Sequence, residues 1–189
     1  MSLRPKSPNG SELRIRNIRF FIEAKQVILK ESIEIPQSAE RVWDVIENPE
    51  TMKLWNPNVK GVVLANWGNR SKGFRYRITY ALNGKPSELE AEIVEYHAPR
   101  RLVIKLTGGH LSKYAYVHEV YDLVPVEGGT RLKQTIEIHD SSIPLIFRIL
   151  LWFIRRFGKP TGDSYLAGVK SLAEDKSALT TREYGASEK

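Results

Sequence analysis

Three polar residues in the second half of the chain fall on a strand face that is otherwise apolar, and they are the best candidates for chemistry. Glu119, Tyr121 and Gln134 belong to two segments, 115–125 and 130–138, in which apolar and polar residues alternate. Such alternation is typical of antiparallel strands with one buried face. A carboxyl, a phenol and an amide brought together on an apolar surface could orient a ligand or transfer a proton.

The turn between the two segments sets which residues lie opposite each other. If Gly128 and Gly129 form a two-residue hairpin turn, Glu119 lies opposite Ile138. The face that carries Glu119 is then mostly apolar, and we expect it to be buried. Its other members are Ala115, Val117, Tyr121, Leu123, Leu132, Gln134, Ile136 and Ile138. The solvated face carries His118, Asp122, Lys133, Thr135 and Glu137.

A carboxyl group on a buried face needs an explanation, because burying a polar group without a partner is costly. Glu119 has a structural explanation, in which it pairs with a buried arginine or a tyrosine hydroxyl, or lies near an open strand end in water. It also has a functional one, in which it faces a ligand and a raised pKa lets it act as an acid or a base. A one-residue bulge would turn it outward. These alternatives stay open at the level of the sequence.

Other catalytic and metal-binding patterns are weak. The chain has no cysteine, which excludes disulfides, thiolate nucleophiles and cysteine metal ligands. The four histidines, His97, His110, His118 and His139, show no ligand spacing, although the last two could face each other on the outer side of the hairpin. The serines lack the context of a nucleophile elbow. We therefore expect no metal and no cofactor, and no sequence motif identifies a catalytic residue.

The segments upstream of the hairpin are expected to build the rest of a sheet. Residues 27–35 alternate as a strand with one exception, Glu31, and Ser38 is a good N-cap for the helix that follows. The Asn-Pro pair at 48–49 ends this helix and can start a second short one. The Asn-Gly pair at 83–84 is a strong hairpin signal. Further strands are expected at 59–66, 74–82, 88–96 and 102–106.

The C-terminal part of the chain has a helical and strongly apolar pattern. Residues 143–154 read IPLIFRILLWFI, which is shorter than the stretch of about 20 apolar residues that a membrane span requires. A Gly-Lys-Pro-Thr-Gly stretch at 158–162 should break the helix. The segment 144–157 would then be a lid or a membrane-facing arm. Beyond the break, helical spacing is kept by Tyr165, Leu166, Val169, Leu172 and Ala173.

An apolar helix that follows a series of antiparallel hairpins has to bury its apolar side, and a curved sheet is the natural partner. If the sheet holds the helix without filling the space between them, a hydrophobic cavity results. Its predicted lining consists of Tyr76, Ile78, Tyr80, Leu89, Ile93, Ile104, Glu119, Tyr121, Gln134, Ile136, Leu166 and Val169.

Composition and charge restrict the class of protein. At 189 residues, with 41% hydrophobic and 27% charged residues, the chain is most simply one globular domain. The net charge of +7 is uneven, because residues 1–30 carry seven basic and two acidic side chains and residues 143–170 carry five and one. No recognised nucleic-acid-binding motif accompanies this charge, so we expect no nucleic-acid partner.

The basic charge lies beside apolar segments, a pattern that can mark attraction to an anionic membrane surface. Residues 13–25 and 144–157 would make this peripheral contact, although a basic tail and solvated helix ends would give the same pattern. The polar N-terminus does not read as a signal peptide. We therefore expect a cytoplasmic protein, with peripheral membrane contact as an open alternative.

Four short motifs carry a family resemblance across residues 27–177. The chain resembles the START-like SRPBCC superfamily, and most closely its polyketide cyclase/dehydrase and lipid-transport branch. The matching motifs are Val42-Trp43-Asp44, Trp55-Asn56-Pro57, Gly73-Phe74-Arg75 and Gly128-Gly129-Thr130-Arg131. The resemblance implies an α+β helix-grip fold, in which a seven-stranded curved antiparallel sheet wraps around a long C-terminal helix and two short helices lie between strands 1 and 2. It also implies a pocket for a hydrophobic small molecule.

These observations predict a helix-grip domain at 27–177, a basic N-terminal extension at 1–26 and a flexible C-terminal tail at 178–189. The favoured function is binding, and transport, of a lipid, a quinone or a polyketide-like molecule. One alternative is a polyketide cyclase or dehydratase that uses Glu119 and a tyrosine as acid and base. Another is a protein-binding module that uses the aromatic residues Trp152, Phe153 and Phe157.

Overall fold

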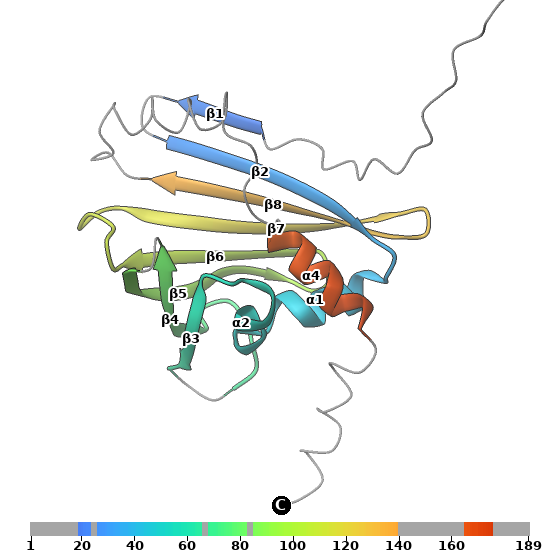
Figure 1. Ribbon diagram of the computed structural model, residues 1–189, viewed down its shortest axis with the longest axis horizontal. Coiled ribbons are helices and arrows are strands. Elements are labelled where there is room, and N and C mark those ends of the chain that lie inside the picture. Colours follow the sequence, from blue (N-terminus) through green and yellow to red (C-terminus); the bar gives the residue numbers. More distant parts are fainter. Residues whose placement is uncertain (1–18, 24–25, 66–67, 83–84, 140–164, 176–189) are drawn as a thin grey trace, which may run out of the picture.

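The computed structural model describes residues 19–23, 26–65, 68–82, 85–139 and 165–175. They form one antiparallel sheet and a small group of helices packed against it (Figure 1). In chain order the elements are β1 (Arg19–Glu23), β2 (Gln26–Ile35), α1 (Ala39–Ile46), η1 (Pro49–Thr51), α2 (Met52–Trp55), β3 (Val59–Leu64), β4 (Arg75–Leu82), β5 (Lys85–His97), β6 (Arg101–Gly108), β7 (Tyr116–Val126), β8 (Gly129–His139) and α4 (Tyr165–Glu174).

The sheet has the strand order β1-β2-β8-β7-β6-β5-β4-β3. The predicted seven-stranded curved sheet corresponds to β2–β8, so the helix-grip fold class is confirmed. β1 is an eighth strand that the sequence analysis did not predict. Its residues, Arg19–Glu23, lie in the segment interpreted as a basic extension, yet they pair with residues 26–30 of β2. The N-terminal segment therefore contributes the edge of the sheet.

The hairpin between β7 and β8 differs in register from the prediction. Val126 pairs with Gly129, so Glu127 and Gly128 are the two turn residues, and Gly128 has the positive φ of 78° that such a turn favours. Gly129 is needed for another reason, because a Cβ atom there would collide with the carbonyl oxygen of Ile35. The true register is shifted by two residues from the predicted one. Since side chains alternate with a period of two, the shift leaves every residue on its predicted face.

The helix α1 begins at the predicted N-cap. The Ser38 side chain accepts a hydrogen bond of 3.3 Å from the backbone N–H of Arg41. The Arg41 side chain donates to the carbonyl oxygens of Ala173 and Asp175, at 3.1 and 2.5 Å, and so joins α1 to the end of α4. The buried side of α1 consists of Val42, Trp43, Val45 and Ile46.

The helix α4 packs against α1, α2 and β2. Leu166, Val169 and Ala173 are its buried residues, as the helical spacing predicts. Gly168 permits a close approach to α2, because a Cβ atom there would collide with the carbonyl oxygen of Trp55. The helix expected beyond the break is thus present and lies against the other helices of the domain (Figure 1).

The arm at 144–157, the break at 158–162 and the tail at 178–189 lie outside the described residues. No helix in the described ranges is long and apolar enough to cross a membrane.

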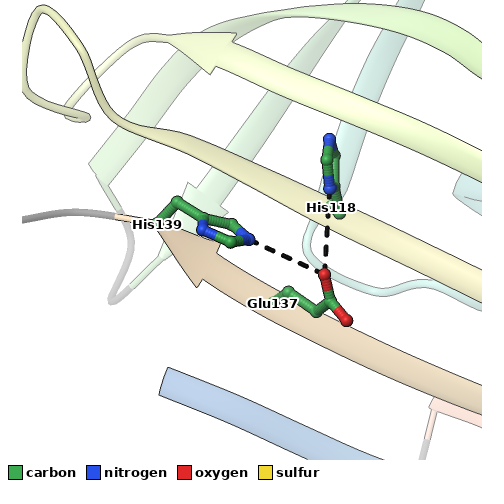
Figure 2. Close-up of side chains that lie close together, drawn as sticks. All are labelled: His118, Glu137 and His139. Carbon is green, nitrogen blue, oxygen red and sulfur yellow. Dashed lines mark ion pairs between the residues drawn. The ribbon is translucent and has the colours of Figure 1, made fainter. Parts of the chain in front are cut away.

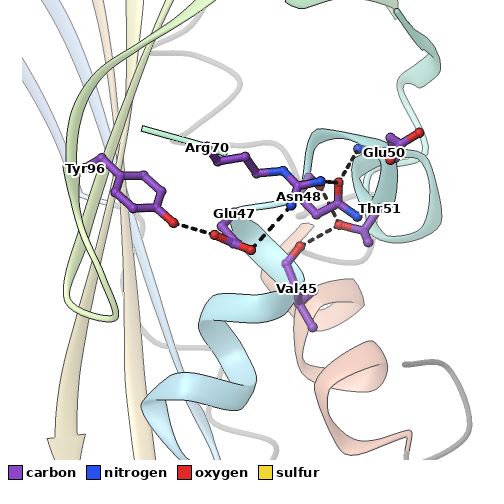
Figure 3. A network of polar contacts seen from close by, with 7 residues as sticks. All are labelled: Val45, Glu47, Asn48, Glu50, Thr51, Arg70 and Tyr96. Carbon is purple, nitrogen blue, oxygen red and sulfur yellow. Dashed lines mark hydrogen bonds and ion pairs between the residues drawn. The ribbon is translucent and has the colours of Figure 1, made fainter. Parts of the chain in front are cut away.

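A network of polar contacts joins the end of α1 to the sheet (Figure 3). The Tyr96 hydroxyl of β5 donates a hydrogen bond of 2.6 Å to Glu47, which follows α1. The Arg70 guanidinium lies 3.6 Å from Glu47 and donates to the side-chain oxygen of Asn48 at 2.7 Å. The Thr51 hydroxyl donates to the backbone carbonyl of Asn48 at 2.7 Å. These contacts connect the turn between α1 and η1 to β5 and to Arg70.

Candidate functional site

One face of the sheet, here called the inner face, carries the predicted lining residues. Directly paired residues of neighbouring strands point to the same side of a sheet. The register pairs Ile93 with Ile104, Ile104 with Glu119, and Glu119 with Ile136. The next row of the same face contains Leu102, Tyr121, Gln134 and Glu31. All ten strand residues of the predicted lining lie on this face.

Glu119, Tyr121 and Gln134 form a hydrogen-bonded chain, here called the inner polar cluster. The Gln134 amide donates to the Tyr121 hydroxyl at 3.0 Å, and this hydroxyl donates to Glu119 Oε2 at 2.9 Å. All three side chains are buried, with exposed fractions of 5%, 1% and 8% for Gln134, Tyr121 and Glu119. Of the alternatives that the sequence left open, pairing with a tyrosine hydroxyl is the one observed. The tyrosine uses only one of the two carboxyl oxygens.

Burial, and not the hydrogen bond from Tyr121, favours the protonated form of Glu119. Burial raises the pKa of this carboxyl, because desolvation disfavours its charged form, and the hydrogen bond from Tyr121 opposes the shift without cancelling it. Burial, followed by the charge of Glu119, raises the pKa of Tyr121 well above its ordinary value. The same two causes raise the pKa of Tyr76. A neutral carboxyl inside the domain can donate a hydrogen bond, which a carboxylate cannot.

Trp55, at the end of α2, adds a donor that the sequence analysis did not include in the site. Its ring meets the ring of Tyr121 edge to face, with centroids 6.5 Å apart. Its Nε1–H is buried and has no hydrogen-bond partner among the residues that the structure describes. A buried indole N–H usually finds a partner, so this donor next to the inner polar cluster is a place where a ligand acceptor fits.

A second polar group lies where β3, β4 and α4 meet. Burial raises the pKa of Tyr80, and the side chains of Asn56 and Asn58 act on it in the opposite direction. Asn58 also donates to the Tyr165 hydroxyl of α4 at 2.5 Å. The sequence analysis placed Tyr80 in the lining but interpreted residues 55–58 only as a turn. The feature of the sequence that could have indicated contact with Tyr80 is the spacing of Asn56 and Asn58 by two residues.

Glu31 is a second carboxyl of the inner face that the predicted lining omits. It pairs in register with Gln134 and is half-buried. The signal was present in the sequence, because Glu31 is the one residue that breaks the apolar alternation of its strand. Its position next to the inner polar cluster makes it a further candidate for contact with a polar ligand group.

Burial of the inner face changes along β7 and β8. Near the hairpin turn, Leu123 and Leu132 are buried, and α1 packs against both strands. Towards the other ends of the strands, Val117, Ile136 and Ile138 are only half-buried. We call these three residues, with their half-buried neighbour Leu29 of β2, the open end of the inner face. The inner polar cluster lies between the packed end and the open end.

The predicted lining residues divide into two groups by burial. Nine are buried, namely Tyr76, Ile78, Ile93, Ile104, Glu119, Tyr121, Gln134, Leu166 and Val169. Three are half-buried, namely Tyr80, Leu89 and Ile136. Leu166 and Val169 belong to the same core cluster as the strand residues, so the structure brings the helix and sheet members together. Their contact with a ligand stays a prediction.

The other face of the sheet has a different character. A hollow of about 330 Å³ there is lined by Arg75, Glu90, Ala91, Glu92, Lys105 and Thr107. Its mostly charged walls do not suit an apolar ligand. Further along this outer face, His118 and His139 lie close together, as the alternation along the hairpin allowed, and Glu137 joins them as a member that the sequence did not indicate (Figure 2).

Comparison with known proteins identifies the family. Residues 26–174 match the family described as "Polyketide cyclase / dehydrase and lipid transport". The match covers most of the chain, and the protein belongs to this family. The START-like resemblance is therefore confirmed, and the fold and family together suggest the binding of hydrophobic ligands. No curated protein matches the chain significantly.

Several solved structures share the fold. The protein TTHA0849 from Thermus thermophilus is 18% identical, with a TM-score of 0.61 over 77% of this chain and 96% of its own. A START superfamily protein from Mycobacterium smegmatis is 16% identical, with a TM-score of 0.59 over 78% and 97%. Ara h 8.0201 is 14% identical, with a TM-score of 0.56 over 78% and 97%. At these identities the likeness shows the fold alone.

Proposed function

We propose that the protein binds and transports a hydrophobic small molecule, such as a lipid, a quinone or a polyketide-like compound, on the inner face of the sheet. The observation that carries this proposal is the change in burial along β7 and β8. The open end offers apolar surface, and the hydrogen-bonding groups of the inner polar cluster lie at one border of that surface. An apolar site with a few convergent polar groups is the usual form of a small-molecule site.

The polar end of the ligand would lie at the inner polar cluster. Glu119, with its raised pKa, donates a hydrogen bond to an acceptor in its protonated form. The Trp55 ring lies against Tyr121 of the same cluster, and its Nε1–H, which has no partner in the described part of the chain, supplies a second donor. Two donors at the boundary of an apolar surface favour a ligand whose head carries a carbonyl or another neutral acceptor.

An enzyme is the second candidate function, and the raised pKa of Glu119 is the observation that favours it. A buried carboxyl hydrogen-bonded to a phenol could pass a proton to a polyketide-like substrate. Binding alone requires no such transfer, so we place the carrier first. The same proposal includes a cytoplasmic location. It also includes peripheral membrane contact through residues 13–25 and 144–157, because a carrier would exchange its ligand at a membrane surface.

Mass spectrometry of the purified protein is the first test. Native spectra, followed by denaturation and solvent extraction, should reveal a retained hydrophobic molecule and identify its class. An extracted molecule that returns unchanged after incubation with fresh protein supports the carrier. Its conversion to a product, abolished in Glu119→Gln, supports the enzyme.

The position of the ligand is tested with 1-anilinonaphthalene-8-sulfonate, a fluorescent hydrophobic probe. Ile136→Trp should fill the open end and weaken probe binding at least tenfold, because the indole takes the place of the ligand. Thr135→Trp is the matched control, since it places the same side chain on the outer face of the same strand. Equal probe affinity in the two variants would contradict a binding site on the inner face.

A further inference from the structure

The outer face of the β7–β8 hairpin gathers three side chains of the kinds that bind transition metals (Figure 2). Glu137 Oε2 lies 3.8 Å from His118 Nδ1 and 3.6 Å from His139 Nε2. One ligand atom from each residue falls within 4.8 Å of the others. All three residues are half-buried. They are therefore partly shielded from water but still reachable by a dissolved ion.

The register of the hairpin explains why these residues meet. His118 of β7 pairs directly with Glu137 of β8, and His139 lies two residues further along β8 on the same face. Tyr116 pairs with His139, and their rings stack with centroids 4.4 Å apart. The stacking restrains the imidazole of His139 in its position beside Glu137. Two strands thus hold all three side chains, and no loop is involved.

The charged neighbours of the group act on a bound cation in opposite directions. Lys105 lies with its Nζ atom 4.8 Å from the centre of the Tyr116 ring, at the side of the group. Its positive charge is a cost to a bound cation, and the negative charge of Glu137 offsets it.

We propose that His118, Glu137 and His139 form a binding site for a divalent transition metal of the Zn²⁺ type. Two imidazoles and one carboxylate are a common ligand set for zinc, with a fourth position left to water. In a tetrahedral site with bonds of about 2.0–2.1 Å, neighbouring ligand atoms lie about 3.3 Å apart, so small side-chain rotations would close the site. The metal would cross-link β7 to β8 on the face opposite the inner polar cluster, so the site does not depend on the proposed ligand-binding function.

Titration of the tag-free, chelator-treated protein with Co²⁺ and Zn²⁺ tests this proposal. We expect one Co²⁺ per chain, with the visible absorption typical of four-coordinate cobalt, and its displacement by one equivalent of Zn²⁺. Calorimetry should give a dissociation constant in the micromolar range or tighter. Six-coordinate cobalt spectra, or binding only at millimolar metal, would overturn the proposal.

Single substitutions assign the ligands. His118→Gln, Glu137→Gln and His139→Gln should each weaken Zn²⁺ binding by more than the roughly 10–100-fold that loss of an outer-shell partner costs. His97→Gln is the matched control, because His97 is also close to a glutamate, at 3.4 Å from Glu95, but has no third ligand among the described residues. Equal affinity in the control and in the three variants would overturn the assignment.

Thermal unfolding provides a readout that also checks that the variants fold. Zn²⁺ should raise the Tm of the wild type and of His97→Gln in a concentration-dependent way, because it binds the folded hairpin. The ligand variants should unfold cooperatively near the metal-free wild-type Tm and show no such rise. A Zn²⁺-dependent rise in His118→Gln equal to that in the wild type would contradict a site on this hairpin.

Discussion

The two faces of the β7–β8 hairpin carry two polar groups with opposite properties. His118 and Glu119 are neighbours in β7, yet their side chains enter different surroundings. Glu119 joins a buried chain of hydrogen bonds with Tyr121 and Gln134, whereas His118 joins a half-exposed group with charged neighbours. The comparison shows that alternation along one strand is sufficient to place a buried carboxyl with a raised pKa one residue away from a group of two histidines and a glutamate.

The difference between the faces is a difference in solvation. On the inner face, desolvation dominates and favours the uncharged form of Glu119. On the outer face, desolvation also disfavours charge on His118, but Glu137 and Lys105 act on it in opposite directions. The inner group is therefore suited to hold a neutral polar ligand, and the outer group to hold a cation.

Truncation of the aromatic residues of β7 should give the largest contrast between the faces. Tyr121→Ala is expected to destabilise the protein by about 3–5 kcal/mol, the range for removal of a large buried aromatic side chain. Tyr116→Ala, on the outer face of the same strand, should cost about 1 kcal/mol because Tyr116 is only half-buried. Urea unfolding followed by circular dichroism measures both. Similar losses in the two variants would contradict the assignment of inner and outer faces.

Removal of the Tyr121 hydroxyl alone isolates the hydrogen bonds of the inner polar cluster. Tyr121→Phe should destabilise the protein by about 1–3 kcal/mol, because Glu119 and Gln134 each lose a buried partner. Tyr114→Phe is the control, since Tyr114 is 85% exposed, and its cost should be close to zero. A neutral Tyr121→Phe substitution would show that water or other groups satisfy the cluster without the tyrosine.

The pH dependence of stability should have opposite signs on the two faces. The folded protein holds the Glu119 proton more tightly than the unfolded chain does, so this residue lowers stability as the pH rises above about 4.5 and through its raised pKa. The pKa of His118 is lowered, so this residue lowers stability as the pH falls below about 6.5 and through its folded value.

Two substitutions separate these effects. Glu119→Gln should gain stability relative to the wild type with rising pH, and His118→Gln should gain it with falling pH. Unfolding free energies measured between pH 5 and 8, without added metal, give the two slopes. Slopes of the same sign would mean that one of the two residues does not have the environment described above.

Much of the fold and part of the candidate site follow from local sequence patterns. The N-cap at Ser38 and the buried spacing of α4 were predicted because capping and helical periodicity act over a few residues. The burial of Glu119 and Gln134 was predicted because face assignment requires only alternation. β1 was missed, because a basic segment with little local signal becomes a strand only when the edge of β2 is available to pair with it.

Other features depend on contacts between distant residues. Trp55 lies beside the inner polar cluster only in the folded domain, where its ring meets the ring of Tyr121 edge to face. The group of His118, Glu137 and His139 depends on the register of the hairpin, which the sequence analysis placed two residues away. With the predicted register, His118 would have faced His139 directly instead of Glu137.

The sequence by itself determined the family, the order of the strands from β2 onward, and the face on which each residue of the final hairpin lies. The tertiary structure alone decided which side chains touch, which end of the inner face is packed by helices, and that the outer face collects three potential metal ligands. The physical reason is that strand faces alternate with a period of two and survive a register shift of two residues, whereas contacts between side chains change with every such shift.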